Sequence, residues 1–471
     1  MAHVLDILRP GTMTSEMIDA VIGDTAGERE KQRLLYLRYR GHPDGTPILK
    51  RKLLIGNDYK VNQKLNTNLA GVIARTKTGY FGGKPVGVNI SEDLVDKKIA
   101  EFSKSIIDSY IWRSSWNQVH TNSVKYATVC GASGRLLYSD DDAETRVRRV
   151  NPWEVILLDA PDPTNPPAAL RVYATRDLQP SGEFEETEHC TYYDRINIIE
   201  FVRTNGRWIP VDSRIHFFGG CPLYMMPNNE ELQGDIEEVI TLHDGYNEIM
   251  SSVVSEVLQL AMAYMYFKNC KFDNEVIRQA MRTGAFRIET SEDSGEPEIG
   301  FIQKNISIDP AKYLAEKIQD DAMHVTGTPN MADESFTNNL SGVAIGYKLV
   351  NLETRCIMAE QEFRRALNHE FTLLCNFYRT RFNVQMNPEA IEYTFTRNLP
   401  RNWEAEAKLV CDLYGKISDE TLFDMLTFTD AKKEKARLAE EGKYEVVLPD
   451  VPEVPGADAR DDFAGNEYGA I

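Results

Sequence analysis

The stretch of the chain that most suggests chemistry is residues 338–350, NNLSGVAIGYKLV, which combines two glycines with a lysine. Such residues bind nucleotide phosphates in Walker A loops, whose pattern is G-x-x-x-x-G-K-[ST] between a strand and a helix. Here three residues separate Gly342 from Gly346, and Lys348 lies two positions further on with no Ser or Thr after it. The preceding residues are polar and loop-like. Spacing and context therefore exclude a phosphate loop.

A second glycine-rich stretch, GYFGGKPVGV at residues 79–88, invites comparison with dinucleotide-binding loops. Those loops follow a strand and space their glycines as G-x-G-x-x-G. This stretch has neither property. We interpret it as a glycine-rich turn.

The histidines and serines form no catalytic or metal-binding motif. The eight histidines include no H-E-x-x-H pattern and no Cys/His cluster, and His369-Glu370 lacks a second histidine four residues on. We interpret His243 and His324, which lie among acids, as solvated or capping residues. No serine or cysteine lies in a recognisable nucleophile motif. A soluble multidomain enzyme remains an alternative, because a triad can be invisible in one sequence.

Acidic residues and cysteines likewise favour a structural role. We expect Asp140, Asp141 and Asp142 to form a hairpin tip, with a carboxylate metal site as the alternative, although no histidine or further acid lies at ligand spacing. The seven cysteines include no C-x-x-C pair. An odd number scattered through apolar segments predicts reduced, mostly buried thiols in an intracellular protein.

Composition limits the class of protein. The chain has 471 residues, a formal net charge of −19 and 42% hydrophobic residues, which indicates an ordered protein of several domains. The negative charge argues against non-specific binding of nucleic acid through its phosphates, but not against a protein past which nucleic acid slides. The N-terminus shows no signal peptide, and residues 253–267 are too short and too polar to span a bilayer. We expect a soluble protein made in a cytoplasm.

The N-terminal half predicts helices followed by strands. One helix is expected over residues 14–40, beginning at Thr14 or Ser15 and ending at Gly41, before a turn at 41–47. Residues 59–78 have helical spacing, and another helix is expected from Ser91 to about residue 116. From about 124 to 220, short β-branched and aromatic runs predict a strand-rich subdomain.

The C-terminal half predicts long helices. Residues 227–269 hold a helical pattern with Asn229 as its cap, and 309–325 begin a second helix with Asp309 and Pro310. Apolar residues then recur every three or four positions from 341 to about 381, a helix about 60 Å long. A short strand at 391–398, helices within 402–441 and a flexible tail rich in Pro, Gly and acid follow.

The order of these elements resembles the portal proteins of long-tailed double-stranded DNA phages, the group typified by phages of Gram-positive bacteria. The stretches that carry the likeness are GYFGGKPV (79–86), NNEELQGDIEEVITLHDGYNEIMS (228–251), TGTPNMADESFTNNLSGVAIGYKLVNLE (326–353), NLPRNWEAEA and ISDETLFDML (398–426). Together they extend from about residue 55 to 440. Their combination is more specific than any one of them.

The resemblance implies an α+β, predominantly helical portal fold assembled as a ring of about twelve subunits around a DNA channel. The parts it implies are a wing (1–229), stem helix 1 (230–262), a clip (263–308), stem helix 2 (309–326), a tunnel loop (327–340), a long wing helix with the following strand (341–399), a crown (400–445) and a flexible tail (446–471).

The resemblance also implies roles for particular residues. The tunnel-loop residues nearest DNA would be Asn330, Asp333, Glu334, Ser335, Phe336, Asn338 and Asn339. Glu316, Asp320 and Asp321 would line the channel as a repelling wall, or form an ordinary solvated helix face. In the clip, Lys268, Lys271, Arg278, Arg282 and Arg287 would contact DNA phosphates or, as we prefer, acids of the next subunit.

The resemblance therefore predicts a non-enzymatic conduit in the virion, at a capsid vertex, made in a bacterial host and needing no cofactor, metal or membrane. Its implied partners are double-stranded DNA, the terminase large subunit, a head-tail adaptor protein, and the major capsid and scaffold proteins. The alternative is another neck or head structural protein. In this interpretation the opening stretch is a hinge: Ser341 caps the long helix, and Gly342 and Gly346 weaken its first turns by up to about 1 kcal/mol each.

Overall fold

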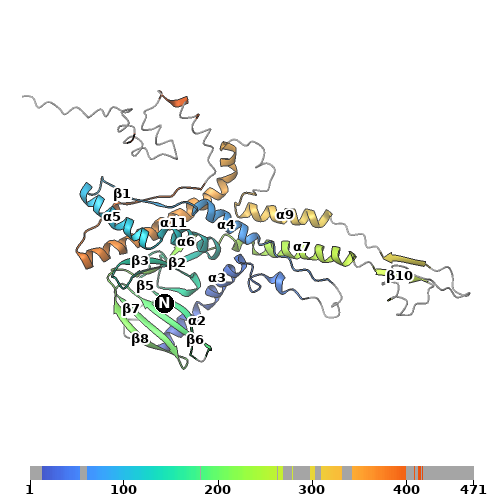
Figure 1. Ribbon diagram of the computed structural model, residues 1–471, viewed down its shortest axis with the longest axis horizontal. Helices are drawn as coiled ribbons and strands as arrows, with labels where there is room; N and C mark the ends of the chain where they lie inside the picture. The colour runs from blue at the N-terminus through green and yellow to red at the C-terminus, as the bar shows by residue number, and fades with distance from the viewer. Residues whose placement is uncertain are drawn as a thin grey trace, which may run out of the picture. The chain divides into compact units, whose positions relative to one another are not determined.

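The computed structural model describes residues 13–52, 61–180, 182–261, 264–268, 278, 298–302, 309–330, 342–398, 408, 412–414, 416 and 437. The chain divides into two compact units, residues 1–399 and 400–471. The helices predicted within 402–441 lie almost wholly outside the described residues, and the predicted tail lies entirely outside them. The first unit combines helices and antiparallel sheets (Figure 1), which confirms a mixed fold.

The long helix predicted from its apolar spacing is present as α11, Gly342–Phe382, which has 41 residues. Its predicted apolar stripe is buried in the largest hydrophobic core. The buried members are Leu349, Leu352, Cys356, Ala359, Phe363, Leu367, Phe371 and Leu374. Because each buried large apolar side chain contributes roughly 1.5–3 kcal/mol, tertiary packing holds this helix in place. The predicted long helix is confirmed.

At the centre of that core lies a charged pair that the sequence pattern did not reveal. Glu370 of α11 and Arg135 of strand β2 (Ala132–Ser139) are both fully buried, with 3.0 Å between their charged groups. Glu370 also accepts hydrogen bonds from Tyr110, Trp116 and Tyr224. Burial, followed by the charge of Glu370, raises the pKa of the Tyr110 hydroxyl well above its usual value. The carboxylate therefore has several donors inside the core.

The strand-rich subdomain is confirmed, although it begins later than predicted. The first part of the predicted stretch is the end of helix α6, Trp116–Cys130. The larger sheet is antiparallel in the order β4-β5-β6-β7-β8, and Ile18 of helix α2 (Ser15–Asp24) packs into its core with Trp208. The strands are β4 (Val155–Leu158), β5 (Ala168–Leu178), β6 (Phe184–Tyr193), β7 (Asn197–Thr204) and β8 (Arg207–Ile215).

A smaller antiparallel sheet has the order β3-β2-β9, with β2 at Ala132–Ser139, β3 at Thr145–Val150 and β9 at Leu223–Pro227. The predicted hairpin tip joins β2 to β3. Asp140 accepts backbone hydrogen bonds from Asp142 and Glu144, and Arg146 lies 2.5 Å from its carboxylate. Asp140 therefore closes a turn. Among the described residues, no group of three His, Cys, Asp or Glu side chains could hold a metal ion.

The helix predicted over residues 14–40 is two helices, α2 (Ser15–Asp24) and α3 (Ala26–Tyr39). The break falls at Thr25, whose hydroxyl donates to the backbone carbonyl of Val21 at 3.0 Å. Such back-bonding by a β-branched residue after Gly and Asp disfavours a continuous helix. Both predicted ends hold: Thr14 accepts from the Met17 amide, and Gly41 has a φ of +67°.

Helices α4 (Leu69–Phe81) and α5 (Lys97–Arg113) begin later than predicted. Asn68, whose side chain accepts from the Gly71 amide, caps α4, while residues 61–67 are neither helix nor strand. Asp96, not Ser91, is at the N-cap position of α5. Several polar residues could cap each helix, and contacts with distant parts of the chain decide among them.

Helix α7 (Ile240–Ala261) also begins later than the pattern predicted, after a 3-10 turn η3 at Glu237–Val239. Asn229 does not cap it: its side chain accepts from the Gln233 amide and closes a loop before η3. The second helix is confirmed to within one residue. It is α9, Asp309–Val325, with Asp309 as its first residue. Among the described residues, no helix is both long and apolar enough to cross a membrane.

Helices α7 and α9 lie side by side (Figure 1) and form a helical hairpin, the name we use for them below. Strands β10 (Tyr264–Lys268) and β11 (Glu298–Ile302) pair antiparallel beyond α7 and before α9. The remaining elements are η1 (Pro47–Lys50), β1 (Gly87–Ile90), η2 (Pro152–Glu154), η4 (Pro388–Ala390) and β12 (Ile391–Thr394), where β12 confirms the predicted short strand and pairs with β1.

Two hydrophobic cores meet beside the hairpin. All buried apolar residues of α11 belong to the largest core. Ala322 and Met323, in the last turn of α9, belong to a second core formed with α3, α4 and α6. The end of α9 and the body of α11 are therefore packed into different cores.

The five described cysteines are buried and form no disulfide, as predicted for reduced thiols; Cys270 and Cys411 lie outside the described residues. Burial raises the pKa of the Cys221 thiol to about 12, so this thiol is protonated and unreactive at neutral pH.

Candidate functional site

The predicted channel-facing acids lie on α9. Glu316 and Asp320 are exposed and Asp321 is partly exposed. Lys312 pairs with Glu316 at 3.8 Å and Lys317 pairs with Asp321 at 2.6 Å, each one helical turn apart. Such exposed pairs contribute little to stability, but they offset the acids locally. The described surface of α9 is therefore mixed in charge, and Asp309 and Asp320 are exposed acids outside these two pairs.

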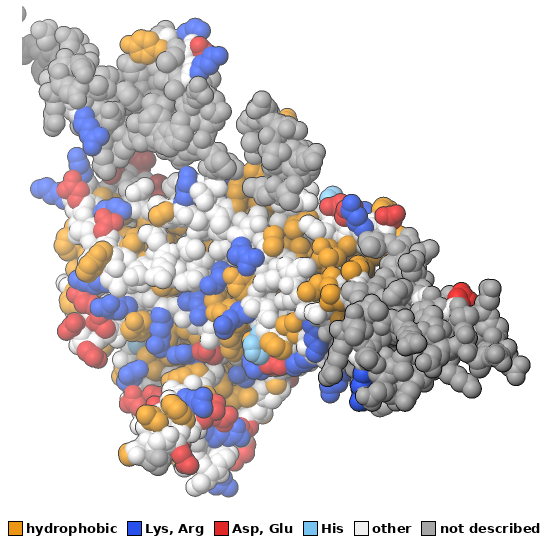
Figure 2. Space-filling model, turned by 45° about the vertical axis from the view of Figure 1, so that its right-hand side comes forward, with side chains coloured by type: hydrophobic (Ala, Val, Ile, Leu, Met, Phe, Trp, Pro, Cys, Tyr) orange, Lys and Arg blue, Asp and Glu red, His pale blue; other side chains and the backbone are white. Residues whose placement is uncertain are grey.

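The molecular surface has the same mixed character. The face shown in Figure 2 intersperses acidic with basic side chains, and hydrophobic side chains gather on part of it. The outer half of the hairpin contributes exposed apolar side chains. These are Val257 (44% exposed) and Leu258 (40%) of α7, and Tyr313 (66%) and Leu314 (49%) of α9.

Residues 61–67, an extended segment that is neither helix nor strand, run along α7, and we call this segment the strap. Alternate backbone amides of the strap donate to polar side chains of α7. The four pairs are Val61 to Gln259 (2.9 Å), Gln63 to Ser255 (2.9 Å), Leu65 to Ser251 (3.0 Å) and Thr67 to Asn247 (3.1 Å). The acceptors recur every four residues and so share one face of the helix. Four helical residues rise about 6.0 Å and two extended residues about 6.6 Å, so the two repeats nearly coincide.

Arg51 bonds to both the strap and α7. Its guanidinium donates to the Gln63 carbonyl at 2.9 Å and to Glu248 of α7 at 2.8 Å. It also bonds to Asn62 and Ser252. One arginine thus joins the strap to α7.

The base of α7 is tied to α3. Arg38 makes two hydrogen bonds to the Asp244 carboxylate, at 2.6 and 3.1 Å, and lies 3.5 Å from the His243 ring. His243 is buried, so its interpretation as a solvated residue is wrong, whereas His324 is exposed as expected. Burial, with the positive charge of Arg38 adding to it, lowers the pKa of His243 to about 4. His243 is therefore neutral at physiological pH.

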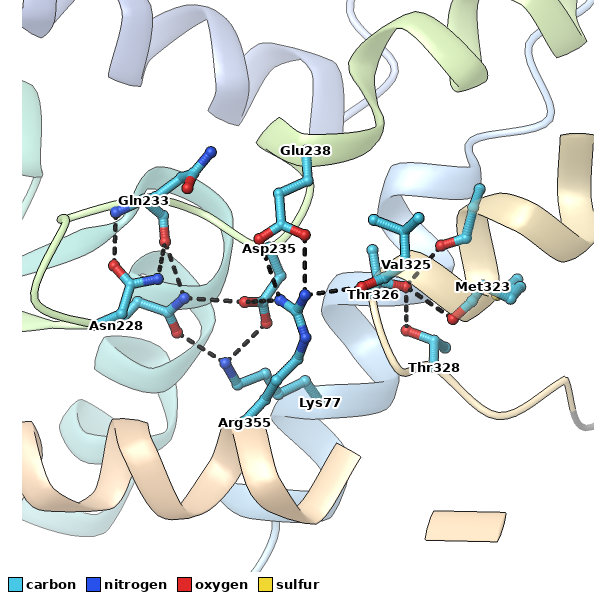
Figure 3. A network of polar contacts seen from close by, with 12 residues as sticks. Lys77, Asn228, Gln233, Asp235, Glu238, Met323, Val325, Thr326, Thr328 and Arg355 are labelled. Carbon is cyan, nitrogen blue, oxygen red and sulfur yellow. Dashed lines mark hydrogen bonds and ion pairs between the residues drawn. The ribbon is translucent and has the colours of Figure 1, made fainter. Parts of the chain in front are cut away.

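A polar network connects the loop before α7 with α4, as Figure 3 shows. Lys77 of α4 and Asp235 of the loop are both nearly fully buried, and their charged groups are 2.8 Å apart. Asn228 bridges them: its amide donates to Asp235 at 3.0 Å, and its carbonyl accepts from Lys77 at 2.9 Å. Each charge therefore has a partner of opposite sign and a neutral hydrogen bond.

Arg355 of α11 joins this network to the end of α9 (Figure 3). Its guanidinium lies 2.9 Å from Glu238 and 3.4 Å from Asp235. It also donates to the backbone carbonyl of Val325, the last residue of α9, at 2.8 Å. A cation at a helix C-terminus is favoured by the helix dipole. Arg355 is thus the residue that links α11, the loop before α7 and the end of α9.

The end of α9 is closed by a compact turn. The Thr328 amide donates to the Met323 carbonyl at 2.9 Å, and the Gly327 amide donates to the His324 carbonyl at 3.1 Å. Gly327 has a φ of +63°, which favours glycine, and an added Cβ would lie 3.1 Å from the backbone of Asn351. Any larger residue here would press on α11. The turn and α11 are therefore in close contact.

The predicted tunnel-loop and hinge residues are described only at their margins. Asn330 is partly buried after the turn that ends α9, Gly342 is the first residue of α11, and Gly346 is exposed. Within the described part of α11, burial begins at Leu349. Asp333, Glu334, Ser335, Phe336, Asn338, Asn339 and Ser341 lie outside the described residues.

The predicted clip cations are likewise described in part. Lys268 of β10 lies 3.3 Å from Glu298 of β11, an exposed pair between strands of the same chain. Arg278 is exposed, and Lys271, Arg282 and Arg287 lie outside the described residues. The structure thus pairs Lys268 with an acid on the neighbouring strand of the same chain.

A comparison with protein families decides which kind of protein this is. A family model described as phage portal protein, SPP1 Gp6-like, matches residues 20–447. The chain belongs to this family of phage portal proteins. No curated protein matches the chain. The family match confirms the predicted resemblance and extends over nearly the whole chain.

The residues that link parts of this portal protein were not among the predicted site residues. Lys77, Asp235 and Arg355 are far apart in the sequence, and each lies among other charged or polar residues. The available signal was the position of Lys77 on the apolar face of α4, between Ala74 and Phe81. A lysine on a buried face requires an acid near it, but the sequence does not say which one.

Proposed function

We propose that this portal protein assembles into a ring-shaped channel at a capsid vertex, through which double-stranded DNA is packaged and later ejected. The observation that carries the proposal is the family match over residues 20–447. The helical hairpin and the 41-residue α11 support it, since both suit the stem and spine of a ring subunit. The protein would act as a structural conduit for motion driven by a separate packaging ATPase.

The proposed parts follow the predicted division of the chain. The wing would combine residues 1–229 with 341–399, and the stem would combine 230–262 with 309–326. Residues 263–308 would form the clip, docking the terminase large subunit and later the head-tail adaptor. Residues 327–340 would be the tunnel loop, and 400–445 the crown. Capsid and scaffold proteins would surround the ring.

The electrostatics of the channel follow from the charge of DNA, which is one negative charge per roughly 1.7 Å of helix axis. A wall of unpaired lysines and arginines would hold the DNA and slow it. In the described part of α9, lysines pair with acids of the same helix. Such a wall offers few free cations, which suits a polymer that must slide past.

The exposed apolar side chains of the hairpin support contacts between subunits in the proposed ring. Val257 and Leu258 project from one helix, and Tyr313 and Leu314 from the other. Burying such side chains gains roughly 25 cal/mol per Å² of apolar surface. A ring uses two different faces of each subunit, and the two helices can supply them.

Native mass spectrometry and negative-stain images of the purified protein test the proposal. We expect a closed ring of about twelve subunits with a central hole, held by head-to-tail contacts. A stable monomer at micromolar concentration would contradict the ring. A solid disc without a hole would favour another head or neck structural protein.

A charge reversal tests the proposed tunnel loop. Changing Asp333 and Glu334 together to lysine should leave the ring intact and impair DNA packaging or retention, because new cations would bind phosphates. The Asp333→Asn, Glu334→Gln variant is the control, since it removes the acids without adding cations. Normal packaging by the lysine variant would show that this loop does not face DNA.

A further inference from the structure

We propose that Arg355 is a releasable latch between α11 and the end of α9, and that the Lys77–Asp235 pair beside it is a permanent anchor. The latch consists of the Arg355 contacts with Glu238, Asp235 and the Val325 carbonyl. Its structural part rests only on the geometry of the network in Figure 3. Its consequence for DNA rests on the channel function proposed above.

The anchor cannot open without a large cost. Both Lys77 and Asp235 have side chains only 3% exposed, so separating them would leave two charges buried. Breaking a buried pair by removing one partner costs about 3–5 kcal/mol. This pair therefore holds the loop before α7 to α4 in every folded state.

The latch differs from the anchor because Arg355 can leave without stranding a buried charge, and Val325, whose carbonyl it also bonds, is 41% exposed to water. Asp235 keeps Lys77 and Asn228, which are its shorter contacts at 2.8 and 3.0 Å. The Arg355 and Glu238 side chains are 26% and 31% exposed, so water can solvate both. Both residues line a pocket of about 340 Å³ open to solvent. Releasing Arg355 thus leaves no buried unpaired charge.

What the latch connects gives it a role. The end of α9 is packed in the core shared with α3 and α4, whereas α11 is packed in the largest core. Arg355 belongs to α11, which is packed in the largest core, and its guanidinium bonds to the end of α9, which is packed in the other core. Beyond the α9 turn the chain continues through residues 331–341 into α11, so the latch fixes one end of this connection relative to the other. Opening it would let the end of α9 shift slightly relative to α11.

The test measures hydrogen exchange at the turn that ends α9. The amides of Thr326, Gly327 and Thr328 donate to carbonyls of α9, and opening the latch exposes them. In an Arg355→Gln variant we expect these amides to exchange at least tenfold faster, with amides of the α6–β2 core unchanged. Arg365→Gln is the matched control, because Arg365 is an ion-paired arginine of the same helix with partners Asp162 and Glu362.

Salt dependence separates a latch from simple destabilisation. Screening weakens exposed pairs far more than buried ones, so exchange at residues 326–328 in the unaltered protein should rise between 0.05 and 0.5 M salt, concentrations over which the Debye length falls from roughly 14 to 4 Å. In Arg355→Gln this dependence should disappear, and Glu238→Gln should reproduce the variant. Unchanged exchange in Arg355→Gln, or equal acceleration throughout the core, would overturn the latch.

The ring assay separates a failure of the proposed latch from a failure of the proposed channel function. Native mass spectrometry of Arg355→Gln reports whether rings form, independently of exchange at the turn. Fast exchange in intact rings, together with DNA leakage from filled heads, supports both the latch and its role in the channel. Fast exchange with normal retention confines the latch to the subunit and removes the link to DNA.

Discussion

At the scale of single residues, the buried pair of Arg135 and Glu370 shows how the largest core is specified. Two charges in an apolar core are costly, and only the full set of donors around Glu370 makes them tolerable. Tyr110, Trp116 and Tyr224 come from three different elements and meet at this one carboxylate. The pair therefore selects one arrangement of α5, α6, β2, β9 and α11.

Removing the charge of Glu370 tests this role. Glu370→Gln leaves Arg135 buried without a counter-charge, so we expect the free energy of unfolding to fall by about 3–5 kcal/mol in urea titrations. Glu392→Gln, an exposed position on β12, should change it by less than about 0.5 kcal/mol. Equal effects of the two variants would contradict a specifying role for the pair.

Buried histidines should make the protein sensitive to acid. Burial lowers the pKa of His120 to about 3, with Arg135 adding to the shift, and His243 is lowered to about 4. Both are neutral in the folded protein, whereas the unfolded chain binds protons near pH 6.5. Their contribution is therefore complete above pH 6.5 and is lost as the pH falls toward 4. At pH 5 the loss is about 2 kcal/mol for each histidine.

His120 offers a direct check of that loss. Its ring stacks on Trp116, and within the described part of the chain neither ring nitrogen has a hydrogen-bond partner. His120→Phe keeps the stacking and removes the titrating group. Thermal melts from pH 7 to pH 5 should show a shallower fall in stability for this variant. An unchanged slope would place the acid sensitivity elsewhere.

At the scale of elements, the strap explains why sequence patterns misplaced a helix. Residues 59–78 have helical spacing, yet 61–67 are not helical, because alternate amides of this segment find acceptors on α7. Hydrogen bonds to residues almost two hundred positions away outcompete a weak local preference. A pattern within twenty residues carries no information about such a partner.

Loss of the strap hydrogen bonds should be visible at the strap itself. Ser251→Ala with Ser255→Ala removes the acceptors for the Leu65 and Gln63 amides. We expect these amides to exchange faster and stability to fall by about 1–3 kcal/mol, since each lost hydrogen bond costs roughly 1 kcal/mol. Thr241→Ala, at an exposed position of α7, is the control. Protected strap amides in the double variant would contradict the ladder.

Elements with strong internal signals were predicted well. The apolar repeat of α11 and the Asp309-Pro310 start of α9 both gave the observed helices. Segments with several possible caps were predicted with correct type but wrong starts, as at Asn229 and Ser91. The junction of Lys77, Asp235 and Arg355 could not be predicted, because it exists only when three distant segments meet.

At the scale of the whole molecule, the outer half of the hairpin should decide assembly. Leu314 is 49% exposed, so Leu314→Asp should leave the subunit folded and disrupt rings, raising the monomer fraction in native mass spectra. Leu178→Asp is the control, because Leu178 is an exposed apolar residue of β5, at 64%. Intact rings with Leu314→Asp would move the contact between subunits away from this half of the hairpin.

The hydrogen-bonding positions of the strap and of α7 repeat at slightly different spacings. Each pair of extended residues advances about 0.6 Å further than each helical turn of four, so three steps accumulate about 2 Å. The two repeats therefore drift apart as such a ladder lengthens, and over the four hydrogen bonds present the match is still close. Removing one residue within the strap would turn the bonded amides on one side of the deletion away from α7. The length of the strap is therefore fixed by its partner helix.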